Sequence, residues 1–95
     1  MARTYDEATA ARRARLGPDA AVQAEVLAQA YEIGLQVVAL REQHDLIQAE
    51  LAERCGIDQA DISRIERGAT SPTTRTLQRI AAALDADVRV VARAS

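Results

Sequence analysis

The fold is decided by residues 46–68, which read LIQAELAERCGIDQADISRIERG. Gly56 divides this stretch, because glycine readily adopts the left-handed conformation in which many helices end. The pattern predicts a short helix over residues 45–54 and a second short helix over residues 59–67. A tight turn around Gly56 would then join the two helices.

Apolar residues recur at helical spacing on both sides of this turn. The residues expected to face inward are Leu46, Leu51 and Ala52 in the first helix and Ile62 and Ile65 in the second, with Ile57 filling the angle between them. The small Ala52 side chain lets the two helices cross closely. Two short helices that cross in this way have the geometry of a helix-turn-helix.

Residues 20–43, upstream of this stretch, are also predicted to be helical. They carry two apolar sets on nearly opposite sides of the helix: Val22, Val26, Ile33, Val37 and Leu40 form one set, and Leu27, Tyr31, Leu35 and Val38 form the other. Gly34 costs a helix about 1 kcal/mol relative to Ala. Two interpretations stay open here. The segment forms two shorter helices with ordinary core faces, or one long helix with a second apolar face for a partner.

Downstream, Thr73 is predicted to cap a further helix that extends to residue 84. Its apolar residues repeat at i, i+3, i+4 and i+7: Leu77, Ile80, Ala81 and Leu84. Residues 88–93 are rich in β-branched side chains and predict a short strand. The predicted fold class is therefore all-α, a compact bundle of about five helices with a helix-turn-helix, plus a short C-terminal β-strand.

A chain of 95 residues has room for one domain. We expect an N-terminal extension over residues 1–18, a helix-turn-helix domain over residues 19–86 and a C-terminal strand over residues 87–95. The motif itself occupies residues 46–68.

The net charge of −2 argues weakly against nucleic acid as a partner, but the distribution of charge matters more than its sum. From Ile62 to Ile80 the cationic residues are Arg64, Arg67, Arg75 and Arg79, and Glu66 is the one acidic residue. An acidic chain can therefore still present one basic face.

Catalytic and metal-binding functions have little support in the sequence. The single histidine, His44, and the single cysteine, Cys55, lie eleven residues apart with no second pair of ligands nearby. No nucleophile–base set or glycine-rich phosphate loop is present. We therefore expect no enzymatic activity, no metal and no cofactor. The longest uncharged stretch, residues 33–40, is far too short to span a bilayer, and we expect a soluble cytoplasmic protein.

In a helix-turn-helix, the first helix lies across the phosphate backbone and the start of the second enters the major groove. The second helix here begins near Gln59 and carries Arg64 on its exposed side. Gln pairs bidentately with adenine and Arg with guanine. These two side chains are the best candidates for contacts with base edges.

The motif and the helix after it resemble the Xre family of helix-turn-helix regulators, the phage-repressor type. The resemblance covers residues 31–84 and includes Gln48, Glu50-Leu51-Ala52, Gly56, Gln59, the run from Ile62 to Gly68, Pro72-Thr73, Thr76-Leu77, Ile80-Ala81 and Ala83-Leu84. It implies a dimer that binds double-stranded operator DNA. The DNA-binding positions that it implies are Gln48, Asp58, Gln59, Ala60, Arg64, Arg67, Thr73 and Thr74. Asp61, Ser63 and Arg75 lie beside these positions and complete the predicted set of DNA-binding residues.

Two features depart from the family pattern. Ile47 stands where the family usually has Thr, so the first motif helix lacks its usual capping hydroxyl and Asp45 is a substitute candidate. Asp58 and Asp61 place negative charge where DNA approaches. Asp58 offsets this as a cap at the helix N-terminus, and Asp61 is able to accept from a cytosine amino group or to point aside.

Tyr31-Glu32-Ile33-Gly34 leads into the motif, and Leu84-Asp85-Ala86-Asp87-Val88-Arg89-Val90 follows it. In this layout the chain as a whole resembles single-domain antitoxins of the HigA type. That resemblance implies a repressor of its own operon that also binds a small ribonuclease toxin. The alternatives are a free-standing Xre-type transcription regulator without a toxin, or a protein-interaction module with little DNA binding.

The predicted C-terminal strand is the expected dimerisation element. A lone strand leaves its N–H and C=O groups unpaired. Pairing with the same strand of a second subunit would satisfy them in a two-fold arrangement through Val88, Val90 and Ala92. The alternatives are pairing with a toxin's sheet edge or folding against the chain's own helices.

Overall fold

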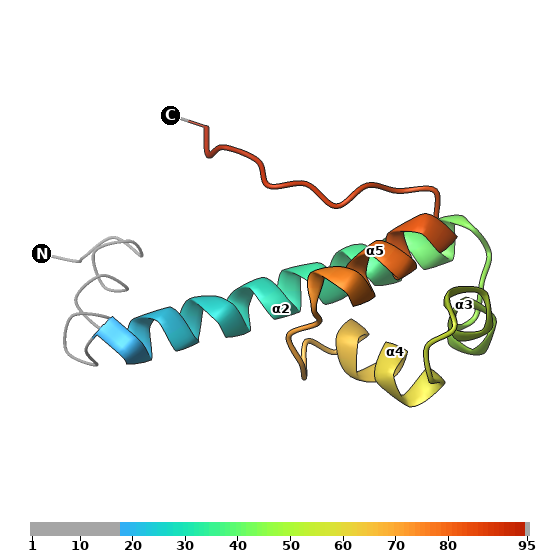
Figure 1. The fold of residues 1–95 in the computed structure, drawn as a ribbon, viewed down its shortest axis with the longest axis horizontal. Helices are drawn as coiled ribbons and strands as arrows, with labels where there is room; N and C mark the ends of the chain where they lie inside the picture. The colour runs from blue at the N-terminus through green and yellow to red at the C-terminus, as the bar shows by residue number, and fades with distance from the viewer. Residues whose placement is uncertain (1–17, 95) are drawn as a thin grey trace, which may run out of the picture.

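The structure, a computed structural model, describes residues 18–94, and this part of the chain forms four helices and no strand (Figure 1). The helices are α2 (Pro18–Gln43), α3 (Gln48–Cys55), α4 (Gln59–Glu66) and α5 (Thr74–Ala83). The all-helical class is confirmed, with four helices in the described residues against an expectation of about five. The predicted N-terminal extension lies outside the described residues, apart from Pro18, which begins α2.

Helix α2 is one continuous helix, so of the two interpretations the long helix is right. Gly34 does not split it and instead permits a close approach. A Cβ atom at this position would lie 2.5 Å from the Ile65 carbonyl oxygen and 2.7 Å from that of Glu66. The end of α4 therefore packs against α2 at a point where only a glycine fits.

The hydrophobic core lies where α3, α4 and α5 meet the C-terminal half of α2. Its buried members are Val37, Leu46, Leu51, Ala52, Cys55, Ile62, Ile65, Ile80 and Leu84, with Ile33, Leu40, Ile57 and Ala83 partly buried against them. The inward faces expected for α3 and α4 are therefore confirmed, and in α5 Ile80, Ala81 and Leu84 are buried as expected, whereas Leu77 is only partly buried. Burial raises the pKa of the Cys55 thiol, which also donates a hydrogen bond to the Ala52 carbonyl.

The N-terminal half of α2 extends beyond the other helices (Figure 1). For this reason Val22 and Val26, which were expected to continue the core face, are exposed by 61% and 41%. Leu27, Tyr31 and Leu35 on the second apolar face are exposed as well. Within residues 18–94, the three other helices pack against the C-terminal half of the long helix, although Ala30 near its middle is also buried.

Gly56 closes α3 in the left-handed conformation, with φ 67°, as expected. The start of α3 differs from the expectation. Asp45 does not cap it, because Ile47 is the N-cap residue. Glu50 Oε1 accepts a hydrogen bond from the Ile47 N–H at 3.0 Å, which is one half of a capping box. The isoleucine side chain has no atom with which to complete the other half.

Of the other two short helices, α5 has the predicted side-chain cap and α4 does not. Thr73 caps α5 as predicted, since its Oγ1 accepts from the Thr76 N–H at 3.1 Å. Asp58 is the N-cap residue of α4, but its side chain makes no capping hydrogen bond. The carboxylate of Asp58 therefore acts on α4 through its charge alone.

The predicted C-terminal strand is not formed within the described residues, where the chain after Asp85 carries no strand pairing. This tail runs back beside the helices toward the start of α2 (Figure 1). Val90 and Val91 are exposed by 104% and 79%. No strand is seen in a single chain because β-branched residues favour an extended backbone, whereas a strand also needs an edge to pair with, and a helical bundle offers none.

Candidate nucleic-acid interface

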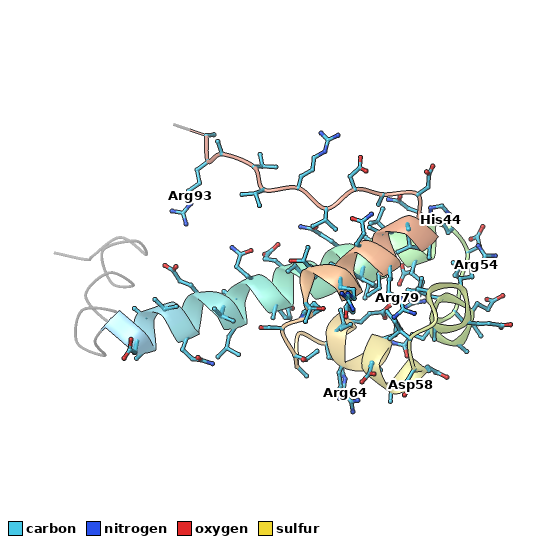
Figure 2. The ribbon with its side chains drawn as sticks, viewed as in Figure 1. His44, Arg54, Asp58, Arg64, Arg79 and Arg93 are labelled. Atoms are coloured by element: carbon cyan, nitrogen blue, oxygen red, sulfur yellow. The ribbon has the colours of Figure 1, made fainter. Side chains whose placement is uncertain are left out.

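Helix α4 packs against α2 and α3, and α3 also contacts α5. The side of α4 that faces away from α2 carries Asp58 and Arg64, both directed outward (Figure 2). The predicted contact residues on and before this helix divide by exposure. Asp58, Gln59, Ala60, Arg64 and Arg67 are exposed, whereas Asp61 and Ser63 are half-buried. These predicted positions therefore lie on α4 or directly beside its two ends.

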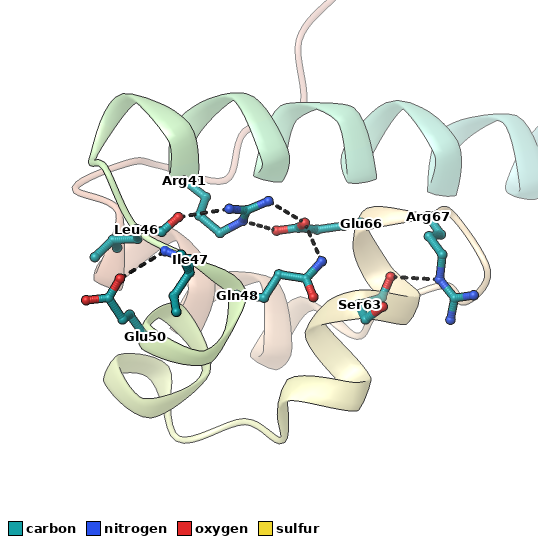
Figure 3. A network of polar contacts seen from close by, with 8 residues as sticks. All are labelled: Arg41, Leu46, Ile47, Gln48, Glu50, Ser63, Glu66 and Arg67. Carbon is teal, nitrogen blue, oxygen red and sulfur yellow. Dashed lines mark hydrogen bonds and ion pairs between the residues drawn. The ribbon is translucent and has the colours of Figure 1, made fainter.

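A polar network anchors the inner side of the motif (Figure 3). Arg41 on α2 donates from Nε and Nη2 to the two carboxylate oxygens of Glu66, at 2.7 and 2.9 Å. Its Nη1 donates to the Leu46 carbonyl at 2.8 Å. The Glu66 side chain is only 4% exposed, and its hydrogen bonds raise the pKa of the Arg41 guanidinium. The pair ties the end of α4 to α2 and to the start of α3.

This network was not predicted from the sequence, although a signal for it exists. Glu66 lies four residues after Ile62 and therefore falls on the same inward face of α4. Its burial has a consequence for the surface. Glu66 is the one acidic residue between Ile62 and Ile80, and its carboxylate is buried and paired with Arg41. The charged side chains that this segment exposes are therefore arginines.

Gln48, predicted to meet a phosphate, belongs to the same network. Its Nε2 donates to Glu66 Oε1 at 2.9 Å (Figure 3). The side-chain amide has a second N–H donor. A phosphate contact from Gln48 stays a prediction, and it would have to use that second donor or the backbone N–H.

Arg64 on α4 and Arg67 directly after it both already have a partner within the chain. Arg64 forms an ion pair with Asp61, three residues earlier on α4. Arg67 donates from Nε to the Ser63 carbonyl at 3.3 Å. Both guanidinium groups keep further N–H donors, because a guanidinium carries five.

The start of α5 lies across a groove from α4. Asp58, Asp61, Arg64, Thr73 and Arg79 are among the residues that line this groove. The Thr73 hydroxyl is committed to capping and to Thr76 Oγ1, whereas the neighbouring Thr74 and Arg75 side chains are exposed. The arrangement brings predicted positions from α4 and α5 to one groove.

Arg79 was not among the predicted contact residues. It extends from α5 toward the turn of the motif (Figure 2), and its Nη2 donates to the Gly56 carbonyl at 3.1 Å. Arg79 therefore connects the turn to α5. The predicted dimerisation residues lie elsewhere, in the tail, where Val88, Val90 and Ala92 are all exposed.

Comparison with known protein families agrees with this geometry. The helix-turn-helix family model matches residues 37–91, which is more than half of the chain. The chain belongs to the Xre-type helix-turn-helix family. The match begins within α2 and includes α3, α4 and α5 of this helix-turn-helix chain. The family resemblance noted in the sequence is therefore confirmed.

Two relatives of this helix-turn-helix chain carry the name Antitoxin HigA1, from Mycobacterium tuberculosis strains CDC 1551 / Oshkosh and ATCC 25618 / H37Rv. Each is 44% identical over 55 residues, and the match covers 58% of this chain and 37% of the relative. No solved structure gives a significant match. None of the helices described in residues 18–94 is both long and apolar enough to cross a membrane.

Proposed function

We propose that this protein is a sequence-specific, double-stranded DNA-binding repressor in the cytoplasm, and that it is the autoregulating antitoxin of a toxin–antitoxin pair. The observation that carries the DNA-binding part is the outer side of α4. It presents Gln59 and Arg64, while the acidic Glu66 is withdrawn into a buried pair. The antitoxin part is supported by the relatives named Antitoxin HigA1.

In this proposal the protein acts as a homodimer. Two recognition helices about 34 Å apart would read a pseudo-palindromic operator. If the dimer neutralises about eight phosphates, the logarithm of the binding constant falls with the logarithm of salt concentration at a slope of about −7.

The test is a titration of the purified protein onto duplex DNA from its own upstream region, beside a scrambled duplex, at about 0.15 M salt. Binding at least about 10³-fold tighter to the native sequence is expected of a specific repressor. Equal and weak binding to both duplexes would overturn the proposal.

A pair of substitutions tests the role of the recognition helix. Arg64→Ala is expected to relax base preference and to cost about 1–3 kcal/mol on the native duplex. Arg54→Ala is the matched control, because Arg54 is an exposed arginine directed away from Arg64 (Figure 2). An equal loss from Arg64→Ala on native and scrambled DNA would refute the base contact.

A second function is favoured by the exposed apolar side chains of α2. Leu27, Tyr31 and Leu35 are each exposed by about half, at 57%, 56% and 46%. In the antitoxin proposal this face binds the toxin, a small ribonuclease. The test is co-expression with the product of the neighbouring gene, followed by co-purification. Substituting Leu27 and Leu35 with Glu should abolish the complex and leave DNA binding unchanged. A complex that survives both changes would exclude this face.

A further inference from the structure

Arg64 lies on the outer side of α4 (Figure 2), where the proposed function places base contacts, and it forms an ion pair with Asp61. The two residues are three positions apart, so their side chains share one face of the helix. About half of each side chain is exposed, 47% for Asp61 and 51% for Arg64. Within residues 18–94, neither side chain has any other hydrogen bond. The pair therefore keeps unused donors on the guanidinium and an unused acceptor on the carboxylate.

The carboxylate of Asp61 has an alternative partner that it does not use. Asp61 is the third residue of α4, the position from which an acidic side chain reaches back to the N-cap N–H in a capping box. No such hydrogen bond to Asp58 forms, and the carboxylate is turned to Arg64 instead. The geometry thus holds the guanidinium of Arg64 on the exposed face.

The pairing changes what Arg64 gains from DNA. A free arginine binds any phosphate, and that attraction carries no sequence information. An ion pair of arginine and aspartate carries no net charge, so the pair gains less from phosphates in general than a free arginine does. The remaining N–H donors of Arg64 still match the O6 and N7 acceptors of guanine, and the free carboxylate oxygen matches the N4 amino donor of cytosine.

We propose that Asp61 and Arg64 read a G·C base pair, or two neighbouring ones, as a single unit, and that Asp61 is a specificity-determining residue that suppresses binding to other sequences. This inference rests on the proposed DNA-binding function. It assigns the pair one ligand chemistry: a guanine edge for Arg64 beside a cytosine amino group for Asp61.

The experiment selects binding sites from a randomised duplex library with the wild-type protein, with Asp61→Asn and with Asp58→Asn. Asp58→Asn is the matched control, because it removes the same charge from the same end of α4 without touching an ion pair. Thermal melts of all three proteins verify that each is folded. The selected sites are then remade with single base-pair changes and titrated.

The wild-type protein is expected to select half-sites with a required G·C pair, and a change of that pair to A·T should weaken binding by about tenfold, as expected for a lost base contact. With Asp61→Asn the same change should matter less than about twofold. Its affinity for scrambled DNA should also rise above that of Asp58→Asn, since Arg64 is released to meet phosphates.

Two results would overturn the inference while leaving the proposed function intact. One is a wild-type protein that discriminates between sequences with an Asp61→Asn variant that keeps every base preference. The other is identical behaviour of Asp61→Asn and Asp58→Asn, which would reduce the effect to general charge. A wild-type protein that selects no sequence would overturn both the inference and the proposed function.

Discussion

At the scale of single residues, Gly34 shows how a contact outweighs a helix propensity. Alanine is favoured over glycine in a helix by about 1 kcal/mol. At this site, however, a Cβ would meet backbone carbonyl oxygens of α4 at 2.5 and 2.7 Å, and a backbone cannot move aside as a flexible side chain can. We expect Gly34→Ala to lower the free energy of unfolding by about 1–3 kcal/mol, the usual cost of overpacking.

Urea denaturation measures this change. The reverse exchange at an exposed position of the same helix, Ala39→Gly, is the control for propensity and should cost about 1 kcal/mol. A stabilised Gly34→Ala variant would contradict the close approach of α4 to α2.

The buried pair of Arg41 and Glu66 leads to a second prediction at this scale. Removing one partner leaves the other charge buried without compensation, which costs about 3–5 kcal/mol. We expect that loss of unfolding free energy from Glu66→Gln. The double variant Arg41→Met with Glu66→Leu should lose only about 1–3 kcal/mol, because its deficit is the loss of hydrogen-bond partners for two neutral groups, the Leu46 carbonyl and the Gln48 amide. Denaturation of the double variant and of its two single variants, Arg41→Met and Glu66→Leu, supplies the values, and a double variant that loses the sum of the two single changes would show that the pair is not coupled.

At the scale of elements, α3 begins with half of a capping box. Ile47 is 62% exposed, so little burial is lost if it is replaced. Ile47→Thr would supply a hydroxyl that accepts from the backbone of the first turn. We expect a gain of about 1 kcal/mol in unfolding free energy, and a rise in Tm of about 4–8 °C for a domain of this size.

Ile47→Val is the matched control for this change, since valine has the shape of threonine without its hydroxyl. The difference in Tm between the two variants measures the contribution of the capping hydroxyl alone. An equal Tm for both would mean that Glu50 alone satisfies the start of α3.

The short elements were predictable because local signals agree with the tertiary structure. Gly56 marks the end of α3, Thr73 caps α5, and Ile62 and Ile65 set the inward face of α4. In α2, by contrast, two apolar faces allowed two interpretations. The packing of α4 at Gly34 decides between them, and that is a contact between residues distant in the sequence.

The candidate interface was predictable only in part, for a similar reason. The exposed positions of α4 follow from its period, whereas the contacts that hold them do not. Glu66 was counted as one surface charge in a basic segment, although it is a buried partner of Arg41. The contact of Arg79 with the Gly56 carbonyl joins residues 23 positions apart, and no local pattern indicates it.

At the scale of the whole molecule, the tail after α5 has apolar side chains and backbone groups that find no partner within residues 18–94 of one chain. Its valines at positions 88, 90 and 91 are all exposed, and its backbone pairs with no strand in the described residues. A second chain would supply what the helical bundle lacks, an antiparallel edge. We therefore expect the full chain to be a dimer with a mass near twice the 10.3 kDa of one chain, and we expect deletion of residues 87–95 to give a monomer.

Light scattering measures both masses, and point variants make the test sharper. In a two-stranded ribbon, positions 88, 90 and 92 share one face and position 91 lies on the other. If the first face covers the helices, Val90→Asp should dissociate the dimer, while Val91→Asp, the matched control, should leave it intact. Because two half-sites must be bound together, the monomeric variants should also lose most of their affinity for a palindromic duplex. A dimer that survives deletion of the tail would instead place the contact between subunits on another surface, for which the exposed apolar side chains of α2 are a candidate.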